Sequence, residues 1–80
     1  MTIETRIDRI ERRLASGEID VVYVITREGY LPRIARINGE EFPRQEGEFL
    51  PALTDRVLVE YRTRYRPVEK VSVLIMDCRH

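Results

Sequence analysis

The chain of 80 residues has very little of the residue types on which many enzymes depend. It has one cysteine, Cys78, one histidine, His80, no tryptophan, and four glycines that stand singly. A structural zinc ion needs four ligands, and isolated glycines form no phosphate-binding loop. Cys78 and His80 also lack an orienting third group for nucleophilic catalysis. We therefore expect no enzymatic activity, no metal or other cofactor, and no small-molecule substrate.

Long apolar runs are missing as well. No stretch approaches the roughly 20 apolar residues that span a bilayer, and the N-terminus has no apolar core of signal-peptide length. A lone cysteine cannot form an internal disulfide, which is typical of a reducing compartment. These absences predict a cytoplasmic protein that does not bind membranes.

Charge of one sign is not in excess either. The chain has 14 basic and 14 acidic residues, so no net field attracts nucleic acid, and Lys70 is the only basic residue that is not arginine. The hydrophobic share of 42% beside 35% charged residues indicates a folded chain. A chain this short supports one core. We therefore expect a single domain over residues 1–80.

Residues 2–15 show helical periodicity. Their apolar residues recur at alternating steps of four and three and form one stripe. The stripe consists of Ile3, Ile7, Ile10 and Leu14. As coiled-coil a and d positions, these residues would place Arg6 opposite Glu11 of a parallel partner helix. Two heptads are marginal alone in water. The helix therefore either docks on its own sheet or forms an interface with another copy.

Strand signals follow. Residues 19–26 and 68–76 are rich in β-branched side chains and nearly apolar on both faces, as in buried strands. Residues 31–37 and 40–42 predict two shorter strands, joined at Asn38 and Gly39. Both of these residues accept the positive φ of a two-residue type I′ hairpin turn.

A second helix is expected after a polar loop. Apolar residues recur at helical spacing from Phe49 to Tyr61, and Pro51 is tolerated in a first turn. The predicted fold is α+β in the order α-β-β-β-α-β. It has an N-terminal helix, a mixed or antiparallel four-stranded sheet with a hairpin, and the second helix packed on the sheet. Two helices usually cover one sheet face, while two strands are apolar on both faces. This mismatch predicts a protein partner, with homo-oligomerisation as the first expectation.

Two charged segments are further candidate contacts. Arg62, Arg64, Tyr65 and Arg66 interleave aromatic and basic side chains, a composition typical of single-stranded nucleic-acid sites. Alternatively, these arginines are solvated or pair with acidic residues. The acidic stretch could itself be an interaction face, or only a device for solubility. The acidic residues in question are Glu40, Glu41, Glu46 and Glu48.

Three runs, residues 7–14, 44–49 and 55–57, together with the β-branched strand after the first run, resemble small uncharacterised proteins of tailed phages and prophages. The resemblance implies a phage setting, hence the host cell cytoplasm, and no assigned activity. The leading hypothesis is a non-enzymatic, self-associating protein-binding or assembly module. One alternative is a phage-encoded inhibitor of a host nucleoprotein defence complex, with the acidic stretch imitating phosphates. The other is a small nucleic-acid-binding protein that uses residues 61–66.

Overall fold

A computed structural model describes residues 5–27 and 31–79 of the chain. This part is an α+β unit with five strands and one helix, in the order β-β-β-β-α-β. The elements are β1 (Thr5–Arg13), β2 (Ile19–Arg27), β3 (Ile34–Ile37), β4 (Glu40–Pro43), α1 (Leu50–Arg64) and β5 (Val71–Arg79).

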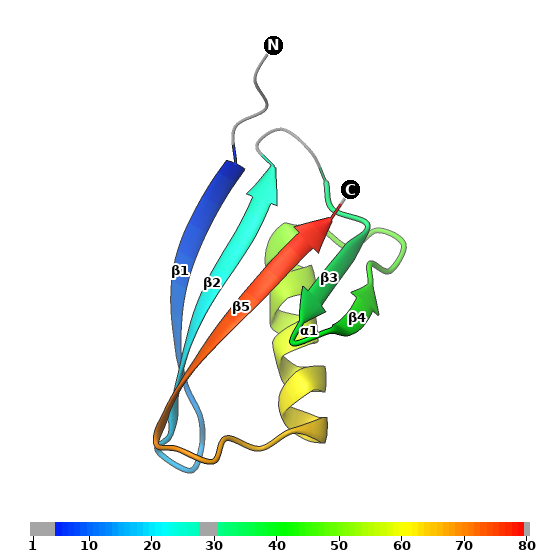
Figure 1. Cartoon of the computed structure of the whole chain (residues 1–80). Helices are drawn as coiled ribbons and strands as arrows, with labels where there is room; N and C mark the ends of the chain where they lie inside the picture. Colours follow the sequence, from blue (N-terminus) through cyan, green and yellow to red (C-terminus); the bar gives the residue numbers. More distant parts are fainter. Residues whose placement is uncertain (1–4, 28–30, 80) are drawn as a thin grey trace.

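The five strands form one mixed sheet with the order β1-β2-β5-β3-β4. β1 pairs antiparallel with β2, β2 pairs parallel with β5, and β5 and β4 flank β3 antiparallel. The last strand of the chain is therefore the central strand of the sheet. Figure 1 shows α1 on one side of the sheet and β1 at its outer edge. The predicted α+β class and mixed sheet are confirmed, but the predicted number of four strands is wrong, because residues 5–13 add a fifth strand.

The predicted N-terminal helix is wrong, because residues 5–13 form strand β1. All nine residues of β1 pair with β2, from Thr5 opposite Arg27 to Arg13 opposite Ile19. Nine residues in a ladder gain more than a two-heptad helix that is marginal in water. Gly17, at φ 88°, lies in the short turn between β1 and β2 instead of ending a helix.

The local predictions for the hairpin and the second helix are confirmed. Asn38 and Gly39 have φ values of 50° and 83°, and Ile37 pairs with Glu40 across them. The helix α1 is 15 residues long and carries Pro51 in its first turn. The final strand begins three residues later than predicted, at Val71, which pairs with Ile19.

The core lies between α1 and one face of the sheet. Strand side chains alternate between two faces, and the even-numbered residues of β2 and β5 face the helix. Their partners from the helix are Leu53, Val57, Leu58 and Tyr61, all buried. The Tyr61 hydroxyl accepts a hydrogen bond of 2.8 Å from Asn38 Nδ2, which ties the hairpin turn to the helix.

A buried ion pair joins the C-terminal part of α1 to β2. Asp20, fully buried on β2, accepts hydrogen bonds from Arg62 Nε at 2.8 Å and Nη2 at 2.5 Å, and from the Ser72 hydroxyl. Burial alone raises the pKa of Asp20, but the hydrogen bonds from Arg62 and Ser72 and the Arg62 charge outweigh burial, so its pKa lies below the ordinary value. The pair fixes the C-terminal part of α1 on the strands.

Replacing Asp20 with asparagine should lower the free energy of unfolding by about 3 kcal/mol, because the Arg62 charge would stay largely buried without its counter-charge. Urea denaturation at pH 7 measures the change. The matched control is Asp77→Asn, which breaks the exposed pair between Asp77 and Arg79. It should cost less than about 1 kcal/mol. Equal losses in the two variants would contradict a dominant role for Asp20.

Candidate interaction surface

The sheet side opposite α1 is apolar, and among residues 5–27 and 31–79 no element covers it. We call this side the open face. Its side chains come from the odd-numbered positions of β1, β2 and β5. Val73 is 63% exposed, Ile75 57% and Ile7 62%. The apolar residues of the open face are Ile7, Ile19, Val21, Tyr23, Ile25, Val71, Val73 and Ile75.

Strand register sets these residues in rows across the sheet. Tyr23 lies between Arg9 on β1 and Ile75 on β5, and Val21 lies between Glu11 and Val73. The apolar residues therefore form a central stripe along β2 and β5, with the charges of β1 on one flank. On the other flank, Arg36 opposes both Asp77 of β5 and Glu41 of β4. An apolar centre within a charged rim is the general anatomy of a protein interface.

One end of the open face is basic. Arg33, Arg44 and Arg79 line a pocket of about 510 Å³ with Ile34 and Pro43, and Arg27 lies beside Arg79 in an adjoining pocket of about 380 Å³. We call Arg27, Arg33, Arg44 and Arg79 the arginine corner. Its one acidic lining residue is Asp77, which pairs with Arg79 at 3.1 Å. The corner therefore keeps an excess of positive charge.

The residues of the predicted N-terminal stripe do not share a face. Ile7 lies on the open face, Ile10 packs against the core on the helix side, and Leu14 follows β1 in the turn. Ile3 lies outside the described residues. Arg6 and Glu11 point to opposite faces of β1, since they are five positions apart on a strand. The proposed coiled-coil pairing of Arg6 with Glu11 is therefore wrong.

The predicted polyanion segment is largely engaged within the chain. Arg62 binds Asp20, as described above, and the Arg64 guanidinium lies 5.5 Å from the centre of the Phe42 ring. The Tyr65 hydroxyl donates to Glu40 at 2.9 Å. Arg66 remains exposed. Arg62 and Tyr65 thus stabilise the fold, whereas Arg64 and Arg66 are exposed and form no ion pair within the described residues.

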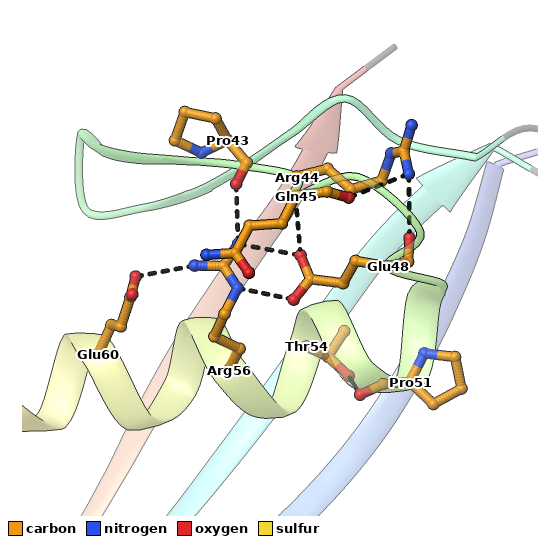
Figure 2. Close-up of polar contacts among 8 residues, drawn as sticks. All are labelled: Pro43, Arg44, Gln45, Glu48, Pro51, Thr54, Arg56 and Glu60. Atoms are coloured by element: carbon orange, nitrogen blue, oxygen red, sulfur yellow. Dashed lines mark hydrogen bonds and ion pairs between the residues drawn. The ribbon is translucent and has the colours of Figure 1, made fainter.

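The predicted acidic stretch is also partnered, apart from Glu46, which is exposed. Glu40 accepts from Tyr65, and Glu41 pairs with Arg36 at 2.7 Å. Figure 2 shows Glu48 held by both Nε and Nη2 of Arg56, at 2.7 and 3.0 Å.

Arg56 also joins the helix to the loop before it. Its guanidinium donates to the Pro43 carbonyl at 2.8 Å and to Glu60 at 3.0 Å (Figure 2). Hydrogen bonds from Arg56 hold the pKa of Glu48 below its ordinary value, against the opposing effect of desolvation.

The remaining candidate sites that we considered are the Cys78 thiol, a metal site and a membrane-spanning helix. Cys78 is buried beneath α1, and burial, with the nearby Asp77 charge, raises its pKa to about 11, so the thiol stays protonated at neutral pH. Within residues 5–27 and 31–79, no three His, Cys, Asp or Glu side chains gather to hold a metal ion. In the same part of the chain, α1 is too short and polar to cross a membrane. His80 lies outside the described residues.

The arginine corner is the feature that sequence reasoning missed. Its members are spread from position 27 to position 79 and meet only because β5 inserts between β2 and β3. The sequence offered one weak indication of this cluster, because Arg27 and Arg79 each stand at the end of a strand.

Comparison of the chain with protein-family models, curated proteins and solved structures finds no match.

The Glu48 carboxylate should make the free energy of unfolding depend on pH in the acidic range. Its pKa is lower in the folded chain than the reference value of 4.5, so its contribution is fully present above about pH 4.5 and is lost as pH falls through the folded pKa. Glu48→Gln should lower stability at pH 7 and reduce the loss of stability between pH 6 and pH 3. Thermal denaturation across this range measures both effects. Glu46→Gln, which removes an exposed, unpaired carboxylate, should keep the wild-type pH dependence.

Proposed function

We propose that the chain is a non-enzymatic protein-binding module whose open face is the binding surface. The observation that carries the proposal is the exposure of Val73 and Ile75, each more than half exposed on the central strand of the sheet. Central strands normally have both faces covered when both are apolar. A contiguous apolar patch of this kind marks an interaction site more often than an ordinary surface.

The charges around the patch indicate the chemistry of the partner. The arginine corner borders one end of the apolar stripe, and arginine is well suited to bidentate contacts with carboxylates. A matching surface has an apolar strip that ends in aspartate or glutamate side chains. The partner is therefore a protein segment with an apolar stretch and acidic residues at one end of it, and the arginine corner fixes its direction on the sheet.

Protein binding accounts for the open face better than nucleic-acid binding does. Single-stranded nucleic acids need stacking platforms of aromatic side chains, and among the described residues of the open face only Tyr23 is aromatic. The exposed apolar side chains along β5 are valine and isoleucine, which offer no flat surface to a base. Arg62 and Tyr65 have partners inside the chain.

Phosphate mimicry by the acidic stretch is also less well supported. Three of its four carboxylates, those of Glu40, Glu41 and Glu48, already have hydrogen-bond donors within the chain. A phage setting remains compatible with the protein-binding proposal, because both an assembly factor and an inhibitor act by contact. Function in the host cytoplasm is part of the same proposal.

Site-specific photo-crosslinking from position 73 tests the binding surface. A photoreactive residue at position 73 should capture a protein in the producing cells, and one at position 59 should not. Val59 is the matched position, because it is an exposed valine, 49% accessible, on the outer side of α1.

The captured protein is then purified and its affinity measured by calorimetry. Val73→Asp should weaken binding by at least about tenfold, because an apolar contact is replaced by a charge that must be desolvated. Val59→Asp should leave the affinity within about threefold of wild type. The proposal fails if crosslinking from the two positions is equal, or if Val73→Asp binds as tightly as wild type.

A further inference from the structure

The two edges of the sheet differ in a way that points to a second interface. β4 is an edge of only four residues that ends at Pro43, and short edges and proline both discourage pairing with another chain. β1 is an edge of nine residues without proline. In the described part of the chain, no strand pairs with its outer side. The outer N–H and C=O groups of β1 therefore offer a template for one more strand.

The charges of β1 are suited to a second copy of β1. In an antiparallel pair related by a twofold axis, residues on the two strands oppose each other symmetrically about a central residue. With Ile10 at the centre, Arg9 of each copy opposes Glu11 of the other on the open face. On the helix side, Asp8 opposes Arg12. This register spans residues 7–13 of both strands and gives four cross-strand ion pairs, two on each face.

Neighbouring registers are repulsive. Centring the pair on Arg9 sets Arg9 against itself and Arg6 against Arg12. Centring it on Glu11 sets Glu11 against itself and Arg9 against Arg13, and centring it on Asp8 opposes the two Asp8 side chains. Like charges directly opposite each other destabilise an antiparallel pair. A register centred on Ile7 avoids this repulsion but, within the described strand, pairs residues 5–9 alone.

Arg12 provides an independent observation. Its Nη1 atom is buried but finds no hydrogen-bond acceptor among the described residues. The neighbouring Asp20 carboxylate accepts its hydrogen bonds from Arg62 and Ser72, although the Arg12 charge also helps to lower the pKa of Asp20. A buried guanidinium nitrogen without an acceptor is costly. In the register centred on Ile10, Asp8 of the second copy lies directly opposite Arg12, so a carboxylate is placed beside this guanidinium group.

We infer that two copies of this chain pair antiparallel through β1, centred on Ile10, and form one continuous ten-stranded sheet. A twofold axis perpendicular to the sheet keeps the open faces of both copies on the same side. The dimer therefore presents two open faces side by side, with the Arg9 and Glu11 side chains between them. The dimer interface is the edge of β1, whereas the proposed binding surface is the open face. Different variants therefore test the two proposals separately.

Charge exchange between Arg9 and Glu11 tests the register. Within one chain Arg9 and Glu11 form an ion pair of 2.7 Å, and both side chains are more than half exposed, so reversing either charge leaves the core intact. Arg9→Glu alone and Glu11→Arg alone should each raise the dimer dissociation constant by about tenfold or more, because two attractive contacts become repulsive. The double variant R9E/E11R should return to within about threefold of wild type. Sedimentation velocity over a dilution series gives these constants for the full chain.

Mixing the two single variants tests the same register in a heterodimer. Each is expected to be mainly monomeric alone, whereas an equimolar mixture should form a heterodimer, since each introduced charge then faces its opposite. This recovery also shows that both single variants are folded. Arg33→Glu, an equal charge reversal near the β4 side of the sheet, should leave the dimer unchanged, and so should Val73→Asp.

Three results would overturn the inference. The first is a wild-type chain that stays monomeric up to about 1 mM, a concentration at which even weak pairs associate. The second is a dimer that is insensitive to Arg9→Glu. The third is a failure of both the double variant and the mixture to restore association.

Discussion

A single helix can cover only one face of a five-stranded sheet, and this constraint governs the rest of the molecule. The 15 residues of α1 cover the even-numbered side chains of β2 and β5 and create the only cluster of buried apolar residues in the described chain. Most odd-numbered side chains of the same strands are also apolar, and in residues 5–27 and 31–79 no second helix covers them, although Val21 among them is buried. The open face follows directly from this shortage of helical cover.

Charged residues in this chain serve mostly to hold the layers together. Arg62 anchors the end of α1 to Asp20 on β2, and Arg56 binds the start of the same helix to the loop that carries Glu48. These pairs engage one charge of the 61–66 segment, that of Arg62, and one of the acidic stretch, that of Glu48. Two further charged regions adjoin the open face. These regions are the arginine corner and the edge of β1. They border the open face on two sides, so charge defines its limits and apolar area fills its centre.

In the proposed dimer, pairing through the edge of β1 is compatible with binding at the open face. Edge pairing through β1 joins strands by backbone hydrogen bonds and cross-strand ion pairs, so it requires none of the apolar area on the open face. The apolar stripe therefore remains accessible after two copies pair. A dimer of this kind would bind a two-fold partner, or two copies of one partner, with greater avidity than a single chain.

Local sequence signals are enough to predict the α+β class, the hairpin at Asn38 and Gly39, the helix with Pro51 in its first turn, and the two strands that are apolar on both faces. Each of these depends on a local preference: positive φ, tolerance of proline in a first turn, or an unbroken run of β-branched residues. The strand at residues 5–13 could not be predicted from local preference, because Ile7 and Ile10 also fit a helical stripe. The stabilisation from pairing these nine residues with β2 depends on a strand elsewhere in the chain. The tertiary structure alone decided which face of β5 is exposed and which arginines meet at one corner, since both depend on the insertion of the last strand between β2 and β3.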